Sequence, residues 1–329
     1  MIIWRPWEGI AADWDAIVIN FHDYTIHQGY AWGEHQQNCG WSVLRLVAFD
    51  DEALVGAAQV LTKLYKFKLG VFWIPGGPLG FSKHWDNRML QVIKHETNAR
   101  LFYCRLSSMM SIGDGADLNL LEAGWVQSST PLSSGLSFHY SLSACEETRL
   151  KNCSSNWRHN LRRALKRDLV ISVWQFPDPE AIVSAYRSMQ LIKNLSDQTS
   201  LRTVDSILRA FGEKCLVIKC EDMDGNILAL RGALLMGHKA LDIFAATTLN
   251  GRKTYASYAV FWQLMSECES RGISSYDLAG VDPINNRGVF DFKKGTGAEL
   301  VHYLGEWDTS EPKLLRKAAN SLLAWKAVL

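Results

Sequence analysis

The chain has 329 residues and a formal net charge of +1, and 47% of its residues are hydrophobic. This length exceeds what one hydrophobic core normally supports, so two domains are expected. The near-zero charge excludes bulk attraction to DNA, RNA or anionic membranes, and any polyanion must therefore be bound by a local patch. Seven cysteines without a Cys-x-x-Cys pair, and a first segment without a signal-peptide pattern, predict a cytoplasmic protein.

Two segments about 175 residues apart share the pattern of a β-hairpin. Residues 41–61 contain an apolar strand, an acidic turn and a second strand with Gly56-Ala57. Residues 214–236 repeat this order, with Asp224-Gly225 as the turn and Gly232-Ala233 at the matching place. The repeated pattern indicates an internal duplication.

The segments that follow the hairpins agree with this interpretation. A helix is predicted at about residues 85–99, leading into a strand at 101–106, and a second helix at 255–272 leads into a strand at 274–280. Residues 141–156 are small and polar, as suits a linker that ends in a helix cap. The predicted fold class is α/β (α+β), with one unit of helix, hairpin, helix and strand present twice.

This order of elements is that of acetyltransferase-like (GNAT) folds, so we expect two tandem GNAT-like domains with a cleft between them. Such folds normally bind the pyrophosphate of an acyl-CoA with a glycine-rich loop at a helix N-terminus. The equivalent loop here, residues 247–257, has one glycine and lacks the usual glycine spacing. This difference argues against acyl-CoA as the donor.

Residues 156–166 predict a helix with a basic face. Arg158, Arg162 and Lys166 follow each other at intervals of four residues, and Arg163 widens the stripe. No acidic residue lies within this segment, so the charges have no local partner. Two interpretations stay open, namely a surface for RNA phosphates and a solvated helix face.

The segment GVFDFKKGTG, residues 288–297, predicts an aromatic-rich strand that ends in two lysines. Lys293, at the strand end beside aromatic residues, could donate to an oxyanion that develops during acyl transfer. Alternatively, its stem covers Phe292 while its ammonium reaches water. If the strand persists, Lys294 points to the other face.

Taken together, the motifs SNWRHNLRRALKR, LRGALL, YASYAVFWQL, YDLAG and GVFDFKKGTG resemble the FemAB/FemX family of aminoacyl-tRNA-dependent peptidyltransferases. A weaker match in the first half covers residues 28–32 and FWIPGGPLG. The resemblance implies a first GNAT-like domain of residues 1–145 plus 312–329 and a second of residues 146–311. It also implies transfer of an amino acid from its tRNA ester to an amine of a cell-wall or cell-surface glycan precursor.

The resemblance also implies roles for individual residues. Phe292 and Lys293 fall on the family's catalytic Phe-Lys pair, with Lys293 stabilising the tetrahedral intermediate or the leaving 3′-oxygen of the tRNA. Arg202 is the nearest counterpart of the arginine that binds the substrate diphosphate. The other expected substrate-binding residues are Gln28, Trp32, Tyr255 and Tyr258. Asp282 is a further candidate because it follows the strand at 274–280, and its alternative role is a local turn cap. The expected contacts to tRNA phosphates are Arg158, Arg162, Arg163 and Lys166.

Two positions depart from the family pattern. Where members often have Pro-Arg-Gly-Pro, this chain has Pro75-Gly76-Gly77-Pro78, and the substrate-binding lysine expected shortly after Trp32 is replaced by His35 or Gln36. Both changes remove positive charge, so the acceptor can differ from a nucleotide-linked muropeptide.

The expected partners are an aminoacyl-tRNA as donor and a cell-envelope precursor as acceptor, without DNA. No cofactor and no metal are expected, since the tRNA ester is already activated and the nine histidines show no metal-binding spacing. The final segment, residues 311–329, predicts an amphipathic helix that either packs on the core or associates weakly with a membrane surface. Two rivals are kept: an N-acyltransferase that uses acyl-CoA or an acyl carrier protein on a surface-polysaccharide amino sugar, and a catalytically silent binding module for a glycan or tRNA.

Overall fold

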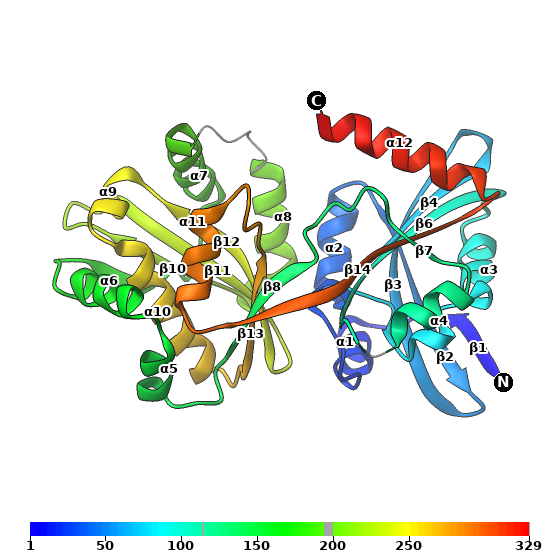
Figure 1. Ribbon diagram of the computed structural model, residues 1–329, viewed down its shortest axis with the longest axis horizontal. Coiled ribbons are helices and arrows are strands. Elements are labelled where there is room, and N and C mark those ends of the chain that lie inside the picture. The colour runs from blue at the N-terminus through cyan, green and yellow to red at the C-terminus, as the bar shows by residue number, and fades with distance from the viewer. Residues whose placement is uncertain (114, 194–199, 329) are drawn as a thin grey trace. The chain divides into compact units, whose positions relative to one another are not determined.

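The computed structural model describes residues 1–113, 115–193 and 200–328, and the chain divides into two compact units (Figure 1). Unit 1 comprises Met1–Leu136 and His302–Leu329, and unit 2 comprises Ser137–Val301. Unit 2 is therefore inserted into the sequence of unit 1. The sequence analysis placed the two boundaries after residues 145 and 311.

Unit 1 is built on a mixed sheet with the strand order β1-β2-β3-β4-β6-β14, and two short strands, β5 and β7, pair with β3 and β14. Among these pairings only β4–β6 is parallel. The strands are β1 Ile2–Pro6, β2 Ser42–Asp50, β3 Ala53–Tyr65, β4 Leu69–Pro75, β5 Leu79–Gly80, β6 Leu101–Ser111, β7 Val126–Gln127 and β14 Glu299–Glu311. The helices are α1 Ala11–Ile19, α2 Tyr30–Asn38, α3 Asn87–Glu96, α4 Ala116–Glu122 and α12 Leu314–Val328, with 3₁₀ turns η1 Ile26–Gln28, η2 Lys66–Lys68 and η3 Ser82–His84.

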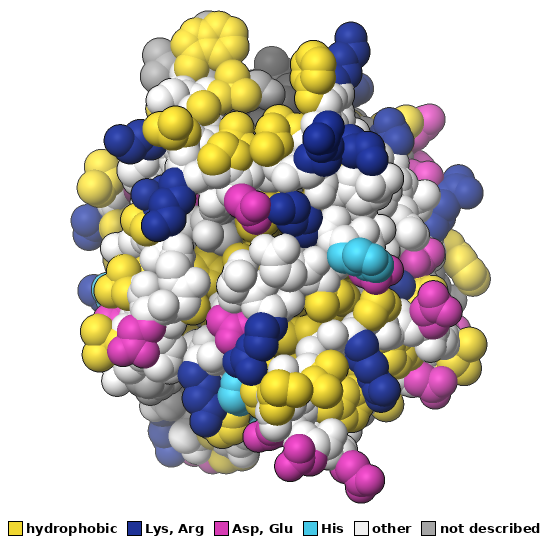
Figure 2. Space-filling view, turned by 90° about the vertical axis from the view of Figure 1, so that its right-hand side faces the viewer, with side chains coloured by type: hydrophobic (Ala, Val, Ile, Leu, Met, Phe, Trp, Pro, Cys, Tyr) yellow, Lys and Arg dark blue, Asp and Glu magenta, His cyan; other side chains and the backbone are white. Residues whose placement is uncertain are grey.

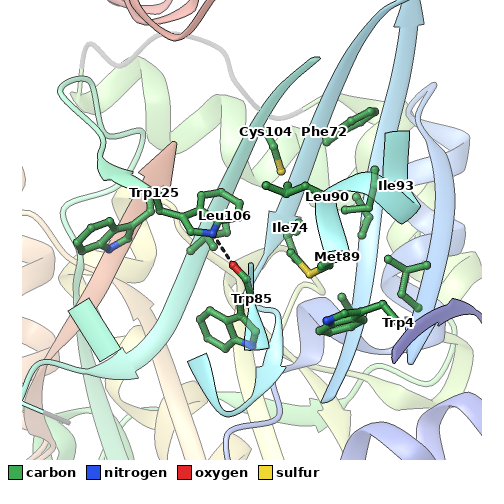
Figure 3. Packing of buried hydrophobic residues seen from close by; sticks show 14 of the residues in the cluster. Trp4, Phe72, Ile74, Trp85, Met89, Leu90, Ile93, Cys104, Leu106 and Trp125 are labelled. Carbon is green, nitrogen blue, oxygen red and sulfur yellow. Dashed lines mark hydrogen bonds between the residues drawn. The ribbon is translucent and has the colours of Figure 1, made fainter. Parts of the chain in front are cut away.

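The core of unit 1 lies between this sheet and α3 (Figure 3). Helix α3 begins where the Asp86 side chain accepts a hydrogen bond from the backbone N–H of Arg88, and its buried face packs beside strand residues such as Phe72. Large buried aromatic residues need partners for their polar atoms, and the indole N–H of Trp125 donates to the carbonyl oxygen of Trp85 at 2.6 Å.

Unit 2 has a second mixed sheet with the order β8-β13-β12-β11-β10-β9, in which only β12–β13 is parallel. Its strands are β8 Leu136–Ser141, β9 Val170–Val173, β10 Cys215–Glu221, β11 Ile227–Met236, β12 Lys239–Thr247 and β13 Ser275–Gly280. Its helices are α5 Glu146–Asn152, α6 Ser155–Leu165, α7 Pro179–Lys193, α8 Leu201–Phe211, α9 Leu249–Lys253, α10 Ala256–Ser270 and α11 Arg287–Gly295, with the 3₁₀ turn η4 Gly212–Lys214.

The duplication predicted from the hairpins is confirmed. The β2–β3 hairpin of unit 1 corresponds to β10–β11 of unit 2, and both are antiparallel. In each unit a helix then connects a parallel pair, namely α3 between β4 and β6, and α10 between β12 and β13. A parallel pair requires such a crossover, and both halves provide it at equivalent places.

The prediction of a strand at residues 288–297 is wrong, because residues 288–295 lie in helix α11 and residues 296–297 form a turn. The aromatic residues at 290 and 292 suggest a period of two, but the helix buries Lys293 and leaves Lys294 exposed, as neighbours on a helix must diverge. An ion pair between Arg287 and Asp291, four residues apart, supports the helix at 3.0 Å.

Within the described ranges, no helix is sufficiently long and apolar to cross a membrane.

Candidate active site

An aromatic cluster in unit 2 surrounds the side chain of Phe292 on α11. The Phe292 ring centroid lies 5.1 Å from that of Tyr258, and 5.9 Å from those of Trp157 and Phe261. Trp157 comes from α6, and Tyr258 and Phe261 come from α10. The tilted and edge-to-face ring pairs fix the position of α11 against both helices. Lys293 is thus held by a packed aromatic wall.

The end of strand β13 supplies the hydrogen-bond partners of Lys293. The parallel pairing of β13 with β12 ends at Asp277, and the pairing of β13 with β8 is irregular between Asp277 and Gly280. Backbone carbonyls in such a bulge are released from the ladder and need other donors. The ammonium of Lys293 donates to the carbonyl oxygens of Ala279 at 3.2 Å and Gly280 at 3.1 Å.

The bulge itself is held in an uncommon conformation. Ala279 has a φ of 61°, in the left-handed region that non-glycine residues rarely adopt. The Asp277 carboxylate stabilises it by accepting from the backbone N–H of Ala279 at 2.8 Å. The Ser137 hydroxyl contacts the same carboxylate and lies 3.0 Å from the carbonyl oxygen of Ala279. These contacts aim two successive carbonyl groups at one ammonium.

Burial controls the charge of Lys293, which is 6% exposed. Burial lowers the pKa of Lys293 to about 8, and among nearby charges Asp242 raises it, Arg231 lowers it and Asp277 raises it. Lys293 is therefore mostly protonated at neutral pH but titrates close to it. An ammonium has three donors, and the two carbonyl groups occupy two of them, so one donor is left for another acceptor.

A buried ion pair lies behind the aromatic wall. The guanidinium of Arg231 donates to both carboxylate oxygens of Asp242, at 2.7 and 2.8 Å, and the Tyr276 hydroxyl donates to Asp242 at 2.8 Å. The guanidinium carbon of Arg231 also lies 5.1 Å from the ring centroid of Phe261 and 5.4 Å from that of Phe292. The pair thus places a fixed cation against the aromatic rings and a fixed anion near Lys293.

The basic helix predicted at residues 156–166 is α6, but its cations differ in what they contact. Arg158 donates to the carbonyl oxygens of Lys151 at 2.6 Å and Cys153 at 2.9 Å, and so caps the end of α5. Arg162 and Lys166 are exposed. The basic surface of α6 therefore begins beyond Arg158.

Arg163 and the two tyrosines of α10 lie at the edge of the aromatic cluster. The guanidinium of Arg163 lies 4.2 Å from the ring centroid of Tyr255, and the Tyr258 hydroxyl accepts from the amide of Asn160 at 3.0 Å. Tyr255 precedes α10 with a φ of 62°. The structure therefore brings Tyr255 and Tyr258 next to the basic helix, and Tyr258 also contacts Phe292, the neighbour of Lys293.

Two other expected substrate ligands of unit 2 have contacts that do not favour this role. The Asp282 carboxylate accepts from the backbone N–H groups of Ile284 and Asn285, at 2.9 and 2.8 Å, and from the Asn285 amide at 2.7 Å. The hydrogen bonds from Asn285 and Ile284 lower the pKa of Asp282, as expected for a local turn. Arg202, on α8, is exposed and lines a groove that also contains three acidic side chains, an unfavourable setting for a diphosphate. These are Asp178, Glu180 and Asp205.

The expected ligands of unit 1 lie around the Pro75–Pro78 turn. The buried amide of Gln28 donates to the carbonyl oxygen of Pro75 at 2.8 Å and accepts from the backbone N–H of Gln59 at 2.6 Å. Gln28 thus clamps the turn instead of facing a ligand. A Cβ added at Gly77 would collide with the Gln28 amide, which accounts for this glycine.

Trp32 packs between two histidines, His27 and His35, with ring centroids 4.6 and 5.3 Å away. Its indole N–H is buried without a hydrogen-bond partner. His35 or Gln36 stands where the resemblance leads one to expect a lysine, and burial lowers the pKa of His35 to about 4. His35 is therefore neutral at pH 7. The folded unit thus carries no positive charge on His35, in agreement with the loss of charge expected from the sequence.

In the loop that would hold an acyl-CoA pyrophosphate, the single glycine packs against the neighbouring backbone. A Cβ on Gly251 would collide with the carbonyl oxygen of Leu228, and the Gly251 N–H donates to the Thr248 hydroxyl at 3.1 Å. The one glycine of this loop is thus required for close packing against β11. Among the residues that the structure describes, no group of three or more His, Cys, Asp or Glu side chains is arranged to hold a metal ion.

Sequence reasoning missed Arg231 and Asp242, the buried ion pair whose charges act on the pKa of Lys293. Arg231 lies within the predicted LRGALL hairpin, yet it was not identified, although a lone charge in an apolar strand signals a buried partner. Asp242 and Tyr276 come from strands distant in sequence, so no local pattern connects them.

Comparison with known proteins defines the class to which this fold belongs. Over 92% of this chain and 96% of the other, the structure matches the crystal structure of FemX with a TM-score of 0.78 and 17% sequence identity. A tandem GNAT protein from the clavulanic acid biosynthesis pathway matches with a TM-score of 0.55 and 11% identity, over 94% of this chain and 98% of that one. The chain is thus a tandem GNAT-like protein, as the order of its elements predicted.

The sequence comparisons are more specific but cover less of the chain. Residues 180–323 match the model of the FemAB family. Aminoacyltransferase FemA of Staphylococcus aureus is 34% identical over 70 residues, a segment that makes up 20% of this chain and 17% of FemA. The resemblance to the FemAB family is confirmed over the matched residues, which include α11 and Lys293, while the match to FemA spans less than a fifth of that protein.

Proposed function

We propose that this chain is an enzyme that transfers an aminoacyl group from aminoacyl-tRNA to an amine of a cell-wall precursor. The observation that carries the proposal is the buried ammonium of Lys293, which is fixed by two backbone carbonyls beside Phe292 and keeps one donor. This arrangement lies within the residues matched by the FemAB family model. The partial sequence match to FemA, an aminoacyltransferase, supports the proposed class of reaction.

In the proposed reaction the acceptor amine attacks the carbonyl carbon of the aminoacyl ester. The carbonyl oxygen becomes an oxyanion, to which Lys293 donates, and collapse of this intermediate breaks the ester C–O bond and leaves an amide. The amine loses a proton and the 3′-oxygen of the tRNA gains one. Because the pKa of Lys293 lies at about 8, its ammonium can supply this proton and then recover one from the amine.

Fixed geometry makes Lys293 suited to this role. A donor that is already oriented needs no reorganisation when negative charge develops, and its effect is strongest where water is excluded. Two carbonyl groups hold the ammonium in place, Lys293 is 6% exposed, and its neighbour Phe292 packs against Trp157 and Tyr258. Orientation of ester and amine then supplies the remaining advantage over solution.

We assign the tRNA backbone to the exposed cations of α6. Arg162, Arg163 and Lys166 are exposed, and helix α6 contains no acidic residue that would neutralise them. Arg163 also stacks on Tyr255 at the edge of the aromatic cluster, so the basic surface adjoins the site of Lys293 through Tyr258. A phosphate backbone bound there would lead its 3′-end towards the cluster.

We assign the acceptor to an amine-bearing cell-wall precursor whose recognition does not depend on the lysine of the family pattern. His35 is neutral and buried at that place, and the Pro75–Pro78 turn has glycine instead of arginine. An acceptor that is recognised through its peptide or sugar, and not through a diphosphate, is consistent with this lower positive charge.

The test uses the full chain with a mixture of aminoacyl-tRNAs carrying ¹⁴C-labelled amino acids, and separately with ¹⁴C-acetyl-CoA. Each donor is offered with nucleotide-linked and with lipid-linked muropeptides, and products are identified by mass spectrometry. Transfer from tRNA, abolished when the ester is first hydrolysed, supports the proposal. Transfer from acetyl-CoA alone would overturn it in favour of an ordinary acyltransferase, and binding of tRNA without transfer to any acceptor would favour a binding module.

A further inference from the structure

Helix α12 of unit 1 carries an apolar stripe on its solvent side. Leu314, Leu322 and Trp325 are 74%, 54% and 61% exposed, and the exposed Ala318 lies between them. Their spacing of four, four and three residues places all four side chains on one face of the helix. Large apolar side chains that are aligned in this way differ from the scattered exposed leucines of an ordinary surface.

The face of α12 opposite the stripe anchors the helix to unit 1, so the helix does not need the stripe for its own packing. Leu315, Ala319 and Leu323 are half-buried on that side. Asn320 is buried there and donates to the Asp308 carboxylate at 2.9 Å, while its carbonyl oxygen accepts from Arg105 at 3.1 Å. These bonds fix the rotation of the helix, and the stripe consequently faces outward.

Basic residues accompany the stripe. Lys313 and Lys317 are exposed and lie on one flank of it, and Arg316 is half-buried next to the anchoring face. No acidic residue occurs from 312 to 328. In Figure 2, hydrophobic and Lys or Arg side chains lie close together at the top of the face drawn, a height that α12 shares in Figure 1 with the tip of the hairpin of β3 and β4. This combination is typical of helices that lie in the plane of a membrane interface.

We propose that α12 is a docking surface for an anionic lipid bilayer. The stripe of Leu314, Leu322 and Trp325 would enter the boundary between headgroups and acyl chains, while Lys313 and Lys317 would reach the lipid phosphates. Charge decides between this occupant and a second copy of the chain. The stripe of a second copy would offer no carboxylate to Lys313 and Lys317, because residues 312–328 contain no acidic residue, whereas anionic lipid neutralises these cations. The proposal is independent of the transfer reaction.

The experiment measures co-sedimentation of the full chain with vesicles of phosphatidylglycerol and phosphatidylcholine, and with vesicles of phosphatidylcholine alone. The wild-type chain is expected to prefer the anionic vesicles at least about tenfold, with the preference falling as salt is added. Leu322→Ser/Trp325→Ser should lower the partition constant at least about tenfold. Lys313→Gln/Lys317→Gln should lower it about 25-fold at low salt, at about fivefold per charge.

A matched control changes two exposed leucines elsewhere in unit 1. Leu118 and Leu121 on α4 are 62% and 54% exposed, but Asp117 and Glu122 flank them, so Leu118→Ser/Leu121→Ser should leave vesicle binding unchanged. Sedimentation equilibrium without lipid checks the oligomeric state of all variants, and circular dichroism checks folding. Three outcomes would overturn the proposal. These are no vesicle binding by the wild-type chain, an equal loss of binding in the control variant, and a dimer that dissociates only in the Leu322→Ser/Trp325→Ser variant.

Discussion

Replacement of Lys293 by Met removes the proposed oxyanion donor and keeps most of the side-chain volume. Other preorganised donors of this kind contribute about 100- to 1,000-fold to turnover, and we expect a loss in this range. Lys294→Met is the matched control, because Lys294 is the next residue on α11 and is exposed. It should change turnover by less than about twofold, because it removes no hydrogen bond of the Lys293 cradle and an exposed substitution usually alters stability by no more than about 0.5 kcal/mol.

The structure predicts that this loss occurs with little change in folding. Without Lys293 the carbonyl oxygen of Gly280 loses its donor, at a cost of about 1–3 kcal/mol, and that of Ala279 keeps only the Ser137 hydroxyl, whose single proton is shared with Asp277. Removing the ammonium also removes its burial penalty. The pKa falls from 10.5 to about 8, which corresponds to about 3 kcal/mol. The two contributions oppose each other and are of similar size.

The assay compares initial rates of transfer from purified aminoacyl-tRNA for both variants, with thermal unfolding measured on the same samples. The rate of the wild-type chain should also fall above about pH 8, as Lys293 loses its proton. Spontaneous ester hydrolysis is subtracted at each pH. Equal turnover of the two variants, or a Lys293→Met chain that is active but unstable, would show that the lysine only holds the bulge of β13.

Three further predictions concern charge. In the folded state the pKa of Lys293 is lowered, so the free-energy penalty of burying its charge is fully present below pH 8 and is lost as the pH rises towards 10.5. Across this window the unfolding free energy of the wild-type chain should therefore rise by about 3 kcal/mol relative to Lys293→Met, as measured by urea titrations. Arg162→Glu/Lys166→Glu should reduce the salt dependence of tRNA binding by about two units in filter-binding titrations without altering thermal stability, and an unchanged slope would make α6 a solvated face. Asp242→Asn should destabilise the chain by about 3–5 kcal/mol because it leaves Arg231 buried and unpaired, whereas Arg231→Met/Asp242→Leu should cost clearly less. Denaturant unfolding measures both, and a double variant that loses as much stability as the two single substitutions added together would contradict this.

Much of the fold could be predicted from the sequence because it depends on local patterns. The hairpins at residues 41–61 and 214–236 carry both the apolar alternation and the turn residues, so each specifies itself without distant contacts. The order of helix and strand after each hairpin then restricts the topology. The identity of Lys293 and Phe292 as a candidate pair also came from the sequence, through the resemblance of their motif.

The tertiary structure alone decided the conformation and surroundings of that pair. Residues 288–297 alternate like a strand, but in the fold residues 287–295 form helix α11, on which Phe292 packs against Trp157 and Tyr258 and Lys293 is buried. Tertiary contacts override such short patterns.

Local pattern also could not reveal which polar residues are free to act. Gln28 is held by Pro75 and Gln59, and Arg158 caps α5, although both have the residue types of a binding site. Conversely, the cradle of Lys293 needs the bulge of β13, which arises where pairing with two different strands ends. The sequence by itself determined the repeated unit and its catalytic candidates, and the fold decided which side chains are already bonded, because hydrogen bonds between distant segments form only when the chain is packed.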